Sequence, residues 1–108
     1  MSSDQSFVDY VCDQMLDAGV IRSRKMFGEF AIYCDDKVVA LVCDDQLFVK
    51  PTPGGRAFLG EPVEAPPYSG AKPYFLIDRL EDRDWLCTLI RLSVQDLPEP
   101  KPKRQRSS

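Results

Sequence analysis

The 108-residue sequence contains no histidine, and this absence narrows its possible chemistry more than any motif does. Without histidine the chain has neither the commonest metal ligand nor the usual general base at neutral pH. Serine–histidine and cysteine–histidine nucleophile pairs are excluded for the same reason. A catalyst built from this chain would have to use lysine, tyrosine, cysteine or carboxylate chemistry, so the sequence favours binding over catalysis.

A long apolar run and a basic leader are also missing from the sequence. The longest apolar run, Val38 to Cys43, is far shorter than the ~20 residues that span a bilayer. Residues 1–5 carry no basic side chain, unlike the start of a signal peptide. The sequence therefore predicts a cytoplasmic protein that makes no membrane contact.

The four cysteines include no pair with the two-residue gap of a zinc knuckle or a redox dithiol. Free cysteine behaves as a small buried hydrophobe, and the neighbours of these residues are largely apolar. We therefore predict reduced, structural cysteines, at least three of them buried, and no bound metal or cofactor. The four residues are Cys12, Cys34, Cys43 and Cys87.

The charge of the chain is distributed unevenly. Residues 1–97 hold 10 basic and 16 acidic side chains, a net charge of −6, whereas residues 98–108 hold four basic and one acidic side chain. We predict one folded domain over 1–97 and a disordered basic tail of Pro, Lys and Arg over 98–108. The tail could contact nucleic-acid phosphates weakly, although it has no aromatic residue to stack on a base. The residues for this contact are Lys101, Lys103, Arg104 and Arg106.

Hydrophobic periodicity predicts helices at both ends of the domain and strands between them. The predicted elements are a helix over 6–18, strands over 25–34, 38–43 and 46–50, a helical turn over 56–59, a strand over 74–77 and a helix over 82–94. Aspartate pairs at 35–36 and 44–45 suit the tight turns of an antiparallel meander. We therefore predict an α+β fold with two layers, an antiparallel β meander packed against the N- and C-terminal helices.

Turn lengths then assign side chains to the two faces of the meander. A three-residue first turn places Cys34 opposite Val38, and a two-residue second turn places Cys43 opposite Gln46. Cys34 and Cys43 then lie on opposite faces, so we expect no disulfide between them. The predicted core face carries Phe30, Ile32, Cys34, Val38, Ala40, Val42, Leu47 and Val49. The opposite face, called the second face below, carries Glu29, Ala31, Tyr33, Val39, Leu41, Cys43, Phe48 and Lys50.

The second face is too apolar to be left fully in water. Its cover could be the proline-rich segment over 51–73, the C-terminal helix or a second copy of the chain. Because both helices can pack on the core face, a symmetric homodimer is one expected arrangement. The residues expected in this self-association face are Tyr33, Val39, Leu41 and Phe48.

Two further motifs have simple structural explanations. Gly54-Gly55-Arg56 lacks the Lys-Ser/Thr ending of a phosphate loop, so we predict a turn that enters a short helix. The aspartate pairs lack the additional oxygen ligands of a divalent metal site, so we predict exposed turns. We assign no catalytic, cofactor-binding or metal-binding residue.

The run Arg24 to Tyr33, which reads RKMFGEFAIY, is distinctive. Together with the hairpin over 38–50, the later GAKPYF over 70–75 and the helix that carries Trp85, it resembles the N-terminal domain of the TfoX/Sxy family of competence regulators. The resemblance runs from about residue 6 to 97 and implies a stand-alone domain without the C-terminal domain of longer members. Those members act as transcriptional co-activators with a cyclic-AMP receptor regulator.

The resemblance implies a non-enzymatic regulatory or protein-interaction domain, with a partner in transcription regulation and a link to natural competence. It supplies no catalytic residue. The alternative is a weak nucleic-acid-binding protein that acts through its basic tail. The third possibility is a small thiol or carboxylate enzyme.

Deleting residues 98–108 is expected to leave the thermal midpoint of unfolding nearly unchanged, because this segment has no apolar side chain to place in the core. Thermal unfolding of the full and shortened chains measures the difference. A loss of more than ~1 kcal/mol would instead mean that the tail packs on the domain.

Overall fold

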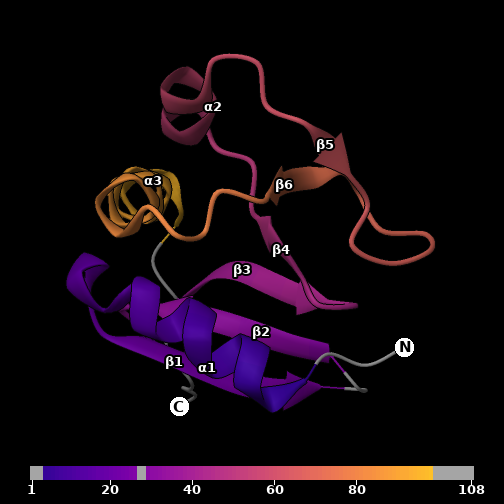
Figure 1. The fold of residues 1–108 in the computed structure, drawn as a ribbon. Helices are drawn as coiled ribbons and strands as arrows, with labels where there is room; N and C mark the ends of the chain where they lie inside the picture. Colours follow the sequence, from indigo (N-terminus) through magenta and orange to yellow (C-terminus); the bar gives the residue numbers. More distant parts are fainter. Residues whose placement is uncertain (1–3, 27–28, 99–108) are drawn as a thin grey trace, which may run out of the picture.

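The computed structural model describes residues 4–26 and 29–98, which form three α-helices and six strands (Figure 1). In chain order the elements are α1 (Gln5–Gln14), the 3-10 turn η1 (Leu16–Ala18), β1 (Ile21–Met26), β2 (Glu29–Cys34), β3 (Lys37–Cys43), β4 (Gln46–Val49), α2 (Pro53–Leu59), β5 (Glu64–Ala65), β6 (Tyr74–Ile77) and α3 (Arg83–Asp96). Figure 1 shows α1 lying across β1, β2 and β3, with α3 beside it.

The strands form one antiparallel sheet in the order β1-β2-β3-β4-β6-β5. Both long helices contribute to a single apolar core against one face of this sheet, so the predicted two-layer α+β fold is confirmed. The largest fully buried side chains of this core are Met15, Ile32, Leu47, Phe75, Leu86, Leu89 and Ile90.

Helix α3 is fixed at both of its ends. Asp82 is the N-cap, and its carboxylate accepts a hydrogen bond of 3.1 Å from the Trp85 backbone N–H. At the other end the Lys37 ammonium of β3 donates to the carbonyls of Val94 and Leu97, at 3.1 Å each. A cation is favourable at a helix C-terminus, where carbonyls lack intrahelical partners, so Lys37 ties the β2–β3 hairpin to α3.

The sequence prediction was wrong about the first strand. Residues 25–34 were predicted as one strand, but β1 ends at Met26 and β2 begins at Glu29 as its antiparallel partner. The residues of β1 are largely polar and exposed because this strand lies at the edge of the sheet. An edge strand does not need alternating apolar and polar residues, so the sequence of β1 gave no strand pattern to recognise.

The register of the first hairpin also differs from the prediction. Cys34 pairs with Lys37 across a two-residue turn, and Tyr33 pairs with Val38. The next pair is Ile32 with Ala40, so Val39 is an extra residue on β3, a β-bulge. The bulge restores the predicted register beyond it. Only Val38 and Val39 are therefore exchanged: Val38 is half-buried beside Tyr33, and Val39 is fully buried in the core.

The proline-rich segment over 51–73 is more ordered than its composition suggests. Thr52 caps α2 through a hydrogen bond from the Gly55 N–H to its hydroxyl, and Pro53 occupies the first turn, where it is tolerated. After α2 the chain returns as β5, which pairs with β6 at the other edge of the sheet. The sequence did not indicate β5, because two residues are too few for a recognisable pattern.

All four cysteines are free, and three of them, at 34, 43 and 87, are buried, as predicted. Cys34 lies in the core and Cys43 lies on the second face, so the predicted separation of these two thiols is confirmed. Burial, helped by the charge of Asp35, raises the pKa of Cys34 to about 11. Burial also raises the pKa of Cys12, which is half-buried.

Thiol titration without reductant should count four thiols in the unfolded protein and fewer rapidly reacting thiols in the folded one. Burial limits access and a raised pKa keeps the unreactive protonated form, so native reactivity should be concentrated at the half-buried Cys12. A count of two in the unfolded protein would mean that a disulfide forms.

Replacing Asp36 with glycine is expected to raise the free energy of unfolding by about 0.5–1 kcal/mol, because Asp36 has a left-handed φ of 69° that glycine adopts without cost. The exposed ion pair with Arg22 that would be lost contributes little. Asp35→Gly is the matched control, since it relieves the same strain but removes an acceptor of the Val20 N–H at 2.9 Å. Chemical denaturation should therefore find a smaller gain for the control, and a loss of stability in Asp36→Gly would contradict the argument.

Candidate interaction surface

The strand pairing arranges the side chains of the second face in rows that cross the sheet. Residues directly opposite each other on neighbouring strands point to the same face. Arg22 pairs with Tyr33, and Tyr33 pairs with Val38. The next row runs Arg24, Ala31, Leu41, Phe48 and Leu76 from β1 to β6. The second face therefore has arginines on its β1 edge and apolar side chains inward from them.

A groove of about 450 Å³ opens on this face. The short side chain of Ala31 is only 1% exposed and lies between its neighbours Arg24 and Leu41, so it forms the floor. Met26 and Tyr68 stand at the rim and are 41% and 51% exposed, which is high for large apolar side chains. The residues that line the groove are Met26, Glu29, Phe30, Ala31, Leu41 and Tyr68.

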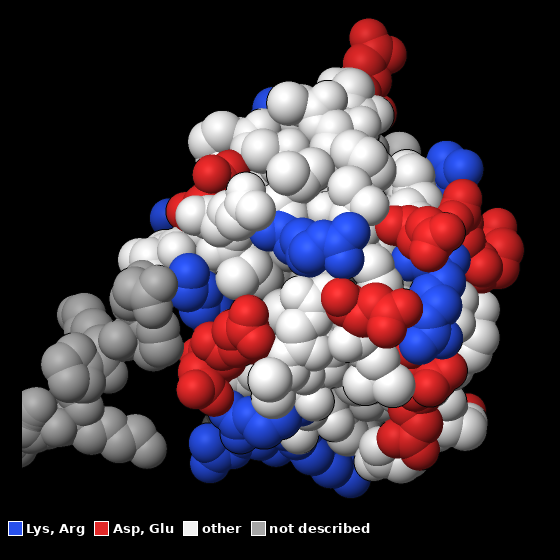
Figure 2. All heavy atoms as spheres, turned by 90° about the vertical axis from the view of Figure 1, so that its left-hand side faces the viewer, with Lys and Arg blue, Asp and Glu red and all other residues white. Residues whose placement is uncertain are grey.

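Arg24 differs from the other arginines that the structure describes. The others pair with carboxylates, donate to a carbonyl or lie over aromatic rings; Arg22, for example, lies over Tyr33 at 5.0 Å and pairs with Asp36. Within residues 4–26 and 29–98, the Arg24 guanidinium has no ion pair, hydrogen bond or ring contact. Figure 2 shows Lys and Arg side chains gathered along the lower edge of the molecule, the level at which β1 lies in Figure 1.

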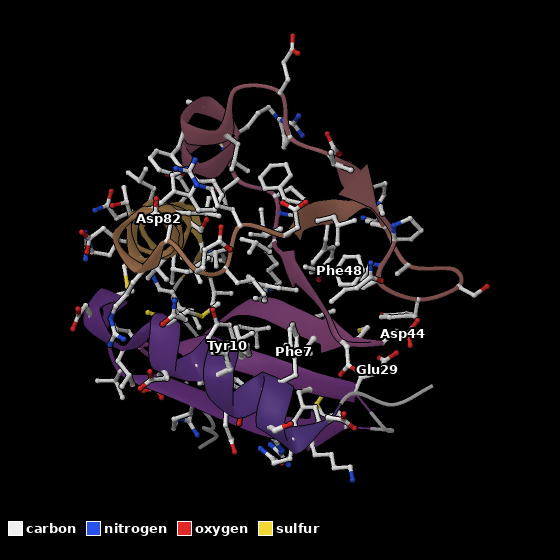
Figure 3. All side chains as sticks on the ribbon, viewed as in Figure 1. Phe7, Tyr10, Glu29, Asp44, Phe48 and Asp82 are labelled. Atoms are coloured by element: carbon white, nitrogen blue, oxygen red, sulfur yellow. The ribbon has the colours of Figure 1, made fainter. Side chains whose placement is uncertain are left out.

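The opposite end of the groove is acidic. The Cys43 thiol donates a hydrogen bond to the Glu29 carboxylate, and Asp44 follows in the β3–β4 turn. Burial first, and then the charge and hydrogen bond of Glu29, raise the pKa of Cys43 to about 12. The thiol therefore stays protonated at neutral pH and is no nucleophile. Figure 3 shows Glu29, Asp44 and Phe48 at the same end of the sheet.

The proline-rich segment covers part of the second face. Tyr68 lies at the groove, and Pro67 beside it is buried. Burial, and then the proximity of Tyr68 and Cys43, raise the pKa of Tyr74. Of the three coverings considered, this segment therefore supplies one, whereas α3 packs in the core on the opposite face.

The four residues predicted for self-association do not share one surface. Tyr33 and Leu41 are half-buried on the second face, as expected. Val39 was assigned to that face wrongly, because the bulge turns it into the core. Phe48 does lie on the second face but is only 3% exposed, since neighbouring parts of the chain cover it. The tail residues proposed for nucleic-acid contact lie outside the described residues.

Sequence reasoning missed the residues that distinguish this surface, namely Arg24, Met26 and Tyr68. The signal for Arg24 was present, since Arg22 and Arg24 alternate with Ile21 and Ser23, but β1 was not recognised as a strand. Tyr68 gave no signal because its position depends on the path of the proline-rich segment.

The described residues contain neither a cluster of metal ligands nor a membrane-spanning helix. Across residues 4–26 and 29–98, no three Cys, Asp or Glu side chains are grouped so that they could hold a metal ion. In the same part of the chain, none of the helices has the length and apolar character needed to cross a membrane.

Comparisons with known proteins agree with the resemblance seen in the sequence. The model of the family described as the TfoX N-terminal domain matches residues 13–97, which include the whole sheet and α3. A Spirochaeta aurantia protein, described as an uncharacterized 12.7 kDa protein in the trpE 5′ region, is 38% identical over 108 residues. The match covers 99% of this chain and 94% of that protein. This chain therefore belongs to the TfoX N-terminal domain family.

Proposed function

We propose that this chain is a non-catalytic regulatory domain that acts by binding another protein through the second face of its sheet. The observation that carries the proposal is the groove floored by Ala31, which is bordered by exposed apolar side chains and by an arginine that has no partner among the described residues. Apolar side chains left in water beside fixed charges are typical of a surface that is buried on binding.

The family membership supports a role for this binding activity in the regulation of natural competence. The TfoX/Sxy family is named for competence regulators, and a domain of this kind would act by contacting a component of the transcription machinery. The three thiols whose pKa is raised by burial, at 12, 34 and 43, support binding rather than thiolate chemistry.

Self-association is a second candidate for the use of this face. With Phe48 covered within the chain, the homodimer proposed from the sequence would have to form through the groove rim, at Met26, Leu41 and Tyr68. Sedimentation equilibrium at micromolar concentration measures this directly, and a chain that stays monomeric would remove the homodimer from consideration.

Deleting the gene in the organism that encodes the chain is expected to change the transcript levels of its DNA-uptake genes and its transformation frequency. Wild-type protein should restore both, because the folded domain carries the activity in this proposal. Protein lacking residues 98–108 is the matched variant and should restore them equally. Restoration by the full chain only would favour the alternative of nucleic-acid binding through the tail, and unchanged transcripts and transformation would contradict a role in competence.

A further inference from the structure

We propose that the partner presents an extended acidic segment to the second face, with a carboxylate on Arg24 and an apolar side chain in the groove floored by Ala31. This inference rests on the proposed function, because it names the chemistry of the partner that the second face would bind. The geometry behind it is the direct pairing of Arg24 with Ala31 across β1 and β2, which brings an unpaired cation to the border of an apolar groove.

The domain is acidic, with 16 carboxylates against 10 cations over 1–97, so carboxylate partners for an arginine are plentiful. Arg22, two residues away on the same face, pairs with Asp36, whereas Arg24 pairs with no carboxylate in the described part of the chain. A guanidinium offers a planar fork of donors that fits a carboxylate with two parallel hydrogen bonds. Arg24 therefore offers a carboxylate-binding group that the domain itself leaves unused.

The spacing between Arg24 and the groove matches that of side chains on an extended segment. Arg24 and Ala31 lie on adjacent strands, which are about 4.8 Å apart in an antiparallel sheet. Side chains two residues apart on an extended segment point the same way and are separated by about 6.6 Å. With the reach of the long arginine side chain, one such segment can place a carboxylate on Arg24 and an apolar anchor between Met26, Leu41 and Tyr68.

The charges at the two ends of the groove differ in sign and give the surface a direction. Glu29 lines the groove at the end away from Arg22, and Asp44 lies nearby. A carboxylate of the partner would be repelled at this end and attracted at the arginine end. The acidic residues of the partner should therefore lie on one side of its apolar anchor only.

The same charges disfavour two other occupants. A nucleic acid carries phosphates along its whole length, so it would bring them against Glu29 in the groove and Asp44 nearby, in a domain whose net charge over 1–97 is −6. A second copy of the chain on a two-fold axis that pairs the arginine ends of the two grooves would bring the two Arg24 side chains toward one another, where like charges repel. An acidic segment whose carboxylates lie only on the Arg24 side of its apolar anchor keeps them away from Glu29 and Asp44, and it brings no second arginine to the groove.

Selection of random twelve-residue peptides displayed on phage, with the full chain as bait, tests this inference. The selected peptides are expected to share an aromatic or aliphatic residue with Asp or Glu on one side of it. A synthetic peptide of the selected sequence should bind the chain more tightly at low salt than at high salt. Selection of peptides with no acidic preference would overturn the inference, and so would tighter binding of a DNA oligonucleotide of matched charge.

Three variants then locate the binding site. Arg24→Glu is expected to weaken binding of the selected peptide at least about tenfold. Lys25→Glu makes the same charge change at the next residue, whose side chain faces the opposite side of β1, and should change the Kd less than about threefold. Ala31→Leu adds a side chain into the groove and should also weaken binding. Thermal unfolding of each variant confirms that it is folded. If Arg24→Glu does not fold, Arg24→Gln replaces it and is also expected to weaken binding of the peptide.

Equal effects of Arg24→Glu and Lys25→Glu would overturn the inference, because they would indicate general attraction to a basic strand. The result is independent of the gene deletion. Transcripts that respond to the deletion together with peptides that lack acidic residues would sink this inference and leave the regulatory role standing. If an acidic peptide binds the groove but the transcripts do not respond to the deletion, this inference stands and the role in competence is contradicted.

Discussion

Two aspartate pairs, at 35–36 and 44–45, have positive φ angles, and the two-residue turns that they form fix the register of β2, β3 and β4. Turns of this kind match the twist of a hairpin, and aspartate tolerates the left-handed conformation better than most residues with a side chain. Because the side-chain period of a strand is two, a slip of one residue would exchange the core face and the second face. The bulge at Val39 shifts the register of β2 and β3 by one residue. Because it lies close to the turn, only Val38 and Val39 exchange faces.

Because of this register, one sheet face packs on the helices and the other carries the groove. The core face carries the side chains that pack on α1 and α3, and Lys37 extends from it to the last carbonyls of α3. Burial of this apolar set is the main source of stability. The second face is covered only in part, by the segment that carries Tyr68. Its groove can therefore be used for binding at little cost to the fold.

The sequence predicted those elements whose pattern follows from burial and missed those that are not buried. Helix α3 and strand β6 were placed nearly to the residue, since each has an apolar set at its own period and α3 has an aspartate cap. Strand β1 was missed because its outward side chains are charged. The groove could not be predicted at all, because it is formed by residues from three strands and from the proline-rich segment, which only the folded chain brings together.

The cations of β1 have a simpler role that must be weighed against binding. Charged side chains on an edge strand prevent it from pairing with another strand, and Arg22, Arg24 and Lys25 all serve this end. Protection of the edge requires only that the strand is charged, and it does not depend on which sheet face each charged side chain occupies. It does not require an arginine beside an alanine floor, or an apolar rim of Met26 and Tyr68 left in water. Edge protection thus accounts for the presence of the charges. It does not account for the position of Arg24 at the border of the groove, where this arginine has no partner in the described part of the chain.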